Sequence, residues 1–168
     1  GVATHGGLKK INAATMEFDT DLDTFKADAA SVVPAQQAGA IAMTAGINKG
    51  DWCPIVAGSM QSQADENIYV LGDASIAKSM PKSGFSANSQ AKVAANHIRG
   101  SLTGSKVFPA RYSNTCWSLV ATNDGVKVGA SYKAGAEKID VTSKFISKTG
   151  ESSDLRKATY EESLGWYE

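Results

Sequence analysis

The stretch NIYVLGDASIAKSMPKSGFSANSQAKVAANHIRG, residues 67–100, decides the fold of this chain. Its residues 68–71 form an uninterrupted β-branched and aromatic run, which predicts a short strand covered on both faces. Gly72 and Asp73 end that strand. After a loop rich in glycine, proline and serine, apolar residues recur at the spacing of one helix face. These residues are Ala87, Ala91, Ala94, Ala95 and Ile98. The stretch therefore predicts a strand, an acidic turn and a helix, in an α/β arrangement.

The ends of the predicted helix suggest where a ligand could bind. Ser83 or Ser86 can cap its start and Gly100 its end. Its free N–H groups then face the carboxyl edge of the strand, where open α/β sheets bind ligands. Asp73 at that edge can accept hydrogen bonds from sugar or polyol hydroxyls. The alternative is that Gly72-Asp73 is only a turn and Ser86 only a cap.

Composition limits the classes of partner. The 168 residues contain 17 Lys and Arg and 17 Asp and Glu, so no net charge favours nucleic acid or an anionic membrane surface. No apolar run approaches the roughly 20 residues of a membrane span. No basic segment followed by an apolar one opens the chain, so the sequence shows no secretion signal.

The flanking segments predict further elements. Residues 8–11, 16–19 and 24–33 read as a meander leading into a core strand, and residues 36–46 as a short helix. Residues 115–121 and 126–132, separated by Asn-Asp-Gly, predict a hairpin, and residues 138–146 a third strand. A final helix begins after Ser152 or Ser153 and closes over the hairpin. Its Tyr160, Trp166 and Tyr167 serve the core or a partner interface, while His97 is predicted to face solvent.

Cysteine is sparse. Cys53 and Cys116 are 63 positions apart, and with only two histidines the spacing matches no metal-ligand pattern. Spacing alone leaves three outcomes open: two buried thiols, one internal disulfide, or two halves of bridges whose partners lie elsewhere.

Four segments resemble one family in the same order. They are VVPAQQAG at 32–39, DWCPIV at 51–56, YVLGDASIAKSMPKSGFSANSQAK at 69–92 and YSNTCWSLVA at 112–121. All are similar to the flavoprotein subunit of flavocytochrome c sulfide dehydrogenase, within the two-dinucleotide-domain flavoprotein disulfide oxidoreductase superfamily. The resemblance implies that residues 1–103 are the C-terminal portion of an FAD/NAD-linked nucleotide-binding domain. It implies that residues 104–168 are the family's C-terminal flavin-binding domain, a small antiparallel β hairpin domain with a C-terminal helix.

The same resemblance implies a site. FAD would be contacted by a set of residues from the first quoted stretch: Gly72, Asp73, Lys82, Ser83, Gly84, Phe85, Ser86 and Asn88. Asp73 would bind the ribitol chain, and the segment 84–88 would hold the flavin pyrimidine end through backbone donors. Cys116 would be one sulfur of a redox-active disulfide over the flavin, and Cys53 a structural, buried thiol.

The chain also departs from the family pattern. It contains no G-x-G-x-x-G, and the partner cysteine of the disulfide and the cysteine that carries flavin covalently are both missing. We therefore expect a C-terminal part of the subunit that is inactive alone.

The implied function is oxidation of sulfide through the disulfide and FAD, with electrons passed to a c-type cytochrome subunit in the periplasm. Two alternatives stay open. One is a pyridine-nucleotide-linked flavoprotein disulfide reductase. The other is a non-catalytic fragment that associates with itself, as a homodimer, or with the missing N-terminal half.

Overall fold

The computed structural model describes residues 6–166, and the chain divides into two compact units at residues 35 and 36. The first unit contains an antiparallel sheet in the order β1-β2-β3. Its strands are β1 (Leu8–Asn12), β2 (Glu17–Thr20) and β3 (Thr24–Lys26). The predicted meander is confirmed, but the prediction of a core strand reaching residue 33 is wrong. Val33 is 83% exposed, because β3 ends at Lys26 and residues 27–33 join no strand of this sheet.

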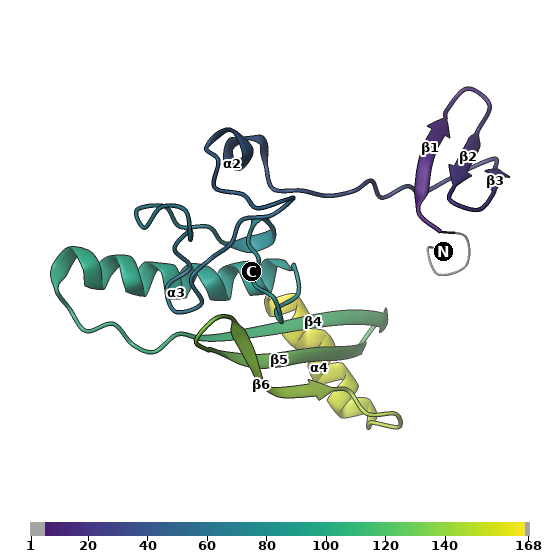
Figure 1. Cartoon of the computed structure of the whole chain (residues 1–168). Coiled ribbons are helices and arrows are strands. Elements are labelled where there is room, and N and C mark those ends of the chain that lie inside the picture. The colour runs from purple at the N-terminus through teal and green to yellow at the C-terminus, as the bar shows by residue number, and fades with distance from the viewer. Residues whose placement is uncertain (1–5, 167–168) are drawn as a thin grey trace. The chain divides into compact units, whose positions relative to one another are not determined.

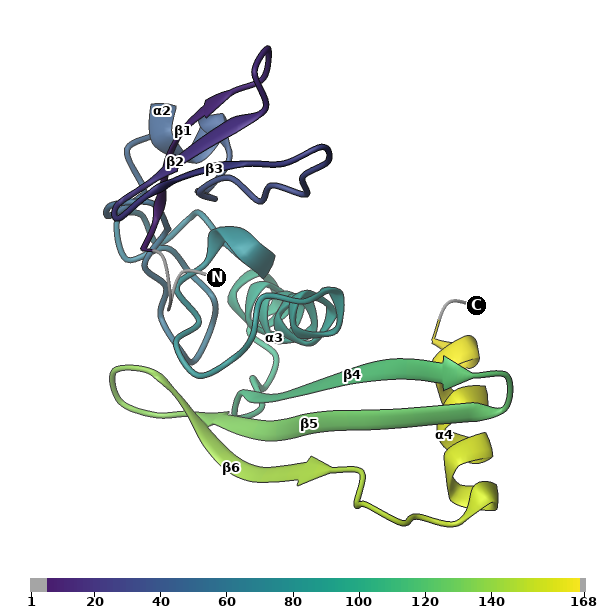
Figure 2. The same ribbon diagram turned by 90° about the vertical axis from the view of Figure 1, so that its right-hand side faces the viewer.

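The second unit packs helices against a second antiparallel sheet, in the order β4-β5-β6. Its elements are α2 (Ala40–Thr44), the 3₁₀ turn η1 (Gly72–Ala74), α3 (Gly84–Thr103), β4 (Arg111–Ala121), β5 (Asp124–Ala134), β6 (Ile139–Ile146) and α4 (Ser153–Gly165). Helix α3 lies beside β4, and α4 crosses the sheet near the β4–β5 turn (Figures 1 and 2). The chain is thus a mixed α/β protein, as the sequence predicts. The boundary after residue 103 stays a prediction.

The hairpin and its third strand follow the sequence closely. Strands β4 and β5 pair from Arg111 opposite Lys133 to Ala121 opposite Asp124. Asn123 takes a left-handed φ of 59° in the connection, a conformation that asparagine tolerates better than most residues. Strand β6 then pairs with β5 from Ile139 to Ile146. Turn chemistry and alternation were sufficient to predict this sheet.

The predicted strand at residues 68–71 is wrong. Tyr69 makes only an isolated antiparallel bridge with Gln61, and Leu71 is 38% exposed. A strand covered on both faces needs neighbours on both sides, and neither sheet of the described chain includes this segment. The apolar run instead places Val70 in the core, which also includes the completely buried Cys53.

Helix α3 starts as predicted and ends later. The Ser83 hydroxyl accepts the Ser86 N–H at 3.1 Å, so Ser83 is the cap and Ser86 lies inside the helix. Gly104, with a left-handed φ of 67°, ends the helix, and the prediction that Gly100 does so is wrong. A Cβ on Gly100 would meet the Val107 side chain at 2.2 Å, so this buried position needs a glycine for packing.

The buried face of α3 also differs from the predicted apolar stripe. Ala94 is buried, but Ala95 and Ile98 are exposed. The residues of the helix that are buried are Ser86, Ser89, Gln90, Val93, Ala94 and Gly100. His97 is half-buried, and its Nδ1 shares a hydrogen bond of 2.8 Å with the Tyr69 hydroxyl. The prediction of a solvent-facing histidine is therefore wrong.

Helix α4 closes over the hairpin, as predicted. Ser152 caps it by accepting the Leu155 N–H, and the helix backbone at Thr159 and Tyr160 approaches Gly125 at the start of β5. Tyr160 is half-buried, and Tyr167 lies outside the described residues. Within residues 6–166, no helix has the length and hydropathy needed to cross a membrane.

The contact between Gly125 and α4 gives a stability prediction. A Cβ on Gly125 would lie 2.9 Å from the Tyr160 backbone nitrogen, whereas one on Gly165 would meet nothing within 4 Å. Gly125→Ala should therefore destabilise the fold by about 1–3 kcal/mol, the usual range for overpacking. Urea unfolding followed by circular dichroism measures this change, with Gly165→Ala as the control. Equal stability of the two variants would contradict the packing of α4 on β5.

Candidate functional site

The turn that carries Asp73 is held by hydrogen bonds from several directions. The Gly72 N–H donates to the Gln90 side-chain oxygen at 2.7 Å, and the Ser75 hydroxyl donates to the Gly72 carbonyl at 2.8 Å. Gly72 has a φ of 69°, which favours glycine. These contacts leave the Asp73 carboxylate exposed at the surface of the turn.

Lys82 ties this turn to the start of α3. Its ammonium donates to the carbonyl oxygens of Asp73 and Ser75 and lies 3.6 Å from the centre of the Trp52 ring. Partial burial lowers the pKa of Lys82, and the nearby charge of Asp73 opposes that effect. The contacts of Lys82 therefore hold the polypeptide in place.

The first turn of α3 presents backbone donors. Ser83 accepts the Ser86 N–H with its hydroxyl and the Ala87 N–H with its carbonyl. Gly84 and Phe85 precede these residues, at positions where a helix N–H has no intrahelical partner. A Cβ built on Gly84 meets nothing within 4 Å, so the helix end is open. Asn88 is exposed one turn further on.

Asn114 joins this helix end to β4. Its side-chain oxygen accepts the Ser83 hydroxyl at 2.5 Å and the Ser86 hydroxyl at 3.1 Å. Its side-chain nitrogen donates to Cys116 Sγ at 3.4 Å. The predicted cofactor segment and the predicted redox cysteine are therefore brought together by a residue that the sequence analysis missed. The available signal was its place two residues before Cys116, on the same face of a strand.

Cys116 is exposed and opens into an apolar cavity of about 770 Å³. The residues that line the cavity are Pro81, Asn114, Cys116, Val128, Gly129, Ala130, Tyr132, Lys144, Phe145, Ile146 and Lys148. Burial raises the pKa of Tyr132, and the charge of Cys116 adds to this shift. The cavity therefore has mainly apolar walls, which suit a flat aromatic ligand, and a sulfur at its surface.

Phe85 contributes its ring to packing. It stacks on Trp166 with centroids 4.5 Å apart and approaches Trp117 at 5.8 Å. The Trp117 indole N–H is buried and has no hydrogen-bond partner among the residues described. The Phe85 side chain thus joins α3 to β4 and to the end of α4, leaving its backbone N–H as the group available to a ligand.

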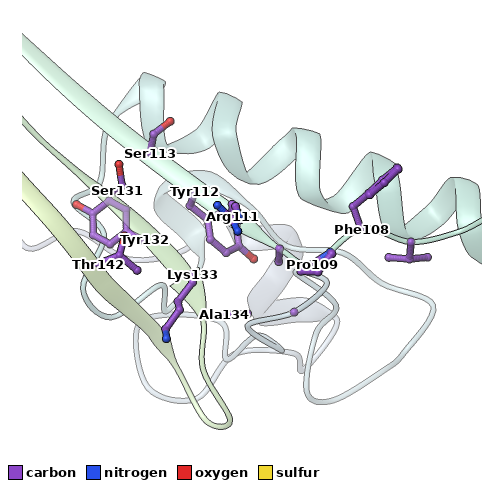
Figure 3. A pocket seen from close by; sticks show the side chains of 13 residues that line it. Phe108, Pro109, Arg111, Tyr112, Ser113, Ser131, Tyr132, Lys133, Ala134 and Thr142 are labelled. Atoms are coloured by element: carbon purple, nitrogen blue, oxygen red, sulfur yellow. The ribbon is translucent and has the colours of Figure 1, made fainter.

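A second cavity, of about 900 Å³, lies where the loop before β4 meets β4 and β5 (Figure 3). Phe108 is 59% exposed there, and the basic residues Arg111 and Lys133 pair directly across the two strands. None of the sequence-predicted site residues lines this cavity.

Cys53 and Cys116 are both free thiols, so no internal disulfide joins them. Cys53 is completely buried, which confirms that part of its prediction, and burial raises its thiol pKa although the charge of Lys82 opposes the shift. The two sulfurs therefore differ sharply in access.

The start of α3, the apolar cavity and the exposed thiol are linked through Asn114. A family comparison covers part of this site. Residues 108–168 match the family model described as flavocytochrome c sulphide dehydrogenase, flavin-binding. The resemblance inferred from the sequence is confirmed over this segment, which contains β4 to β6, α4 and Cys116.

The residues present fit a flavin such as FAD. Two backbone donors at the open end of α3 suit the oxygens of the pyrimidine ring, and the exposed Asp73 carboxylate suits a polyol chain. The apolar cavity beside Cys116 suits the ring system. The roles of the individual site residues remain predictions.

The difference in access between the two thiols can be measured in the native chain. With 5,5′-dithiobis(2-nitrobenzoic acid), one thiol should react promptly and the second only after denaturation, because Cys53 is completely buried. Cys116→Ser should abolish the prompt reaction, and Cys53→Ser should leave it intact. Prompt reaction of both thiols in the native protein would contradict the structure.

Proposed function

We propose that this chain forms the flavin-facing part of an enzyme that oxidises sulfide through a redox-active disulfide and FAD and passes the electrons to a c-type cytochrome. The observation that carries the proposal is the position of Cys116. The sulfur lies in the wall of an apolar cavity, and Asn114 connects it to the capped start of α3. Cys116 and Asn114 both lie in the segment 108–168, which matches the family model of a flavin-binding domain.

Each predicted site residue then has a role that its contacts permit. The Asp73 carboxylate accepts hydrogen bonds from the ribitol hydroxyls. The N–H groups of Gly84 and Phe85, with the positive end of the α3 dipole, bind the pyrimidine carbonyl side of the ring. Gly72 and Lys82 hold the turn that presents Asp73.

The serines and Asn88 complete that set. Ser83 and Ser86 hold the helix start against Asn114. Asn88 follows them at the exposed surface of the helix, where its backbone lies within the segment 84–88.

In the oxidised protein Cys116 forms a disulfide with a cysteine other than the buried Cys53. Sulfide, as HS⁻, attacks one sulfur of that disulfide. A new S–S bond to the substrate sulfur forms, the bond between the cysteines breaks, and the departing cysteine leaves as a thiolate with the bonding electron pair. A bound flavin would supply the two-electron acceptor for this step.

The cytochrome partner and the periplasmic location belong to the same proposal. The description of the matching family names a flavocytochrome c, which pairs flavin with a c-type haem. A catalytic disulfide also suits an oxidising compartment.

The proposal is tested by sulfide-dependent loss of the visible absorbance of flavin, in the flavin-loaded protein that contains this chain. Cys116→Ser should slow this reduction by more than about 100-fold, because the disulfide can no longer form. Cys53→Ser is the matched control and should reduce at close to the parent rate. If the Cys116→Ser protein is reduced by sulfide as fast as the parent, the function proposed for Cys116 is wrong. Rapid reduction by NADH instead of sulfide would favour a pyridine-nucleotide-linked reductase.

A further inference from the structure

We propose that Asn114 is a positioning residue that stabilises Cys116 as the thiolate and so directs sulfide to the other sulfur of the disulfide. This inference rests on the function proposed above and adds the direction of attack. Asn114 is 4% exposed, and its three side-chain hydrogen bonds connect α3 to the sulfur.

The orientation of the Asn114 amide follows from its serine partners. The Ser83 oxygen accepts the Ser86 N–H, and its own hydrogen is free to donate. The Asn114 side-chain atom nearest to it lies 2.5 Å away, a separation that suits an O–H···O hydrogen bond and is too short for N–H···O, so this atom is the amide oxygen. The Ser86 hydroxyl donates to the same oxygen at 3.1 Å. The amide oxygen therefore faces α3, and the NH₂ group is fixed toward Cys116.

The hydrogen bond from the Asn114 amide to Cys116 stabilises a thiolate more than a neutral sulfur. At 3.4 Å the amide donates weakly to a neutral sulfur, but a thiolate is a charged acceptor and its hydrogen bonds are stronger. In disulfide exchange, the sulfur that is better stabilised as a thiolate is the better leaving group. Sulfide therefore bonds to the partner cysteine, giving a persulfide there, while Cys116 leaves with the electron pair.

The titratable groups around Cys116 are the same in the parent and in the protein with Asn114→Ala. The titratable groups that share the cavity with Cys116 are Tyr132 on β5, Lys144 on β6 and Lys148 after β6. The α3 groups nearest Asn114 are the hydroxyls of Ser83 and Ser86, which carry no charge. A shift in Cys116 reactivity in Asn114→Ala, which adds no charge, therefore reports the loss of the amide contact.

The test is the pH profile of Cys116 alkylation by iodoacetamide in the reduced chain, followed by mass spectrometry of the Cys116 peptide. Asn114→Ala removes the donor, and its profile should move to higher pH by about half a unit to one unit. Asn114→Asp keeps an acceptor for both serines, removes the donor and adds a negative charge, so it should move further in the same direction. Ser118→Ala, a change at an exposed residue of the same strand outside the cavity lining, is the control and should follow the parent profile.

A second measurement needs no substitution. In the parent chain, the side-chain N–H resonances of Asn114 should shift with the same pH midpoint as the alkylation of Cys116. Parent-like alkylation profiles in folded Asn114→Ala and Asn114→Asp, or resonances that do not follow Cys116, would overturn the proposal. A merely structural Asn114 would lower the melting temperature without moving the profile.

The role of Asn114 can be tested separately from the proposed function. The alkylation profile needs neither flavin nor sulfide, so it tests only the contact between Asn114 and Cys116. The sulfide-dependent reduction of flavin, compared in Cys116→Ser and Cys53→Ser, tests the function itself. If the profile is insensitive to Asn114 while Cys116 remains essential for reduction, the function stands and the role of Asn114 fails.

Discussion

The hydrogen bonds of the Asn114 side chain link the start of helix α3 to strand β4, and the geometry of the candidate site depends on them. This side chain is a buried amide at the centre of a polar contact between a helix and a sheet, and its oxygen and nitrogen are both engaged. A buried amide left without partners is costly, so the two serines at the start of α3 and the sulfur on β4 are held in one arrangement. The same hydrogen bonds that stabilise the fold thus place an open helix end beside an exposed thiol.

The contact between α3 and β4 is polar, and this explains which parts of the structure could be predicted from the sequence. The hairpin, the third strand and α4 depend on local signals: Asn-Asp-Gly between alternating runs and a serine cap before the helix. The contact face of α3 does not follow such a signal. Its buried residues include Ser86, Ser89 and Gln90. The Ser86 and Ser89 side chains bond to β4, and the Gln90 side chain bonds to η1. Apolar periodicity therefore predicts the wrong contact face of α3, and it gives no signal for Asn114 on β4.

Contacts between residues far apart in the sequence explain the remaining differences between the predicted and the observed structure. Residues 68–71 have the composition of a buried strand, but composition cannot supply neighbouring strands, and the segment makes one isolated bridge. His97 was misplaced for a related reason, since its partner Tyr69 lies 28 positions away. The arrangement of the predicted site residues follows the sequence more closely, because Gly72, Asp73 and the start of α3 lie near one another along the chain, whereas the link to Cys116 is long-range. The binding roles of these residues stay predictions.

The central claim is that flavin binds between the start of α3 and the Cys116 cavity. Backbone amide NMR of the chain during titration with FAD tests it most directly, because even weak binding shifts the resonances of contacting residues. The largest shifts are expected at Asp73, Gly84, Phe85 and Cys116. Shifts confined to the second cavity, around Phe108 and Lys133 (Figure 3), would contradict it.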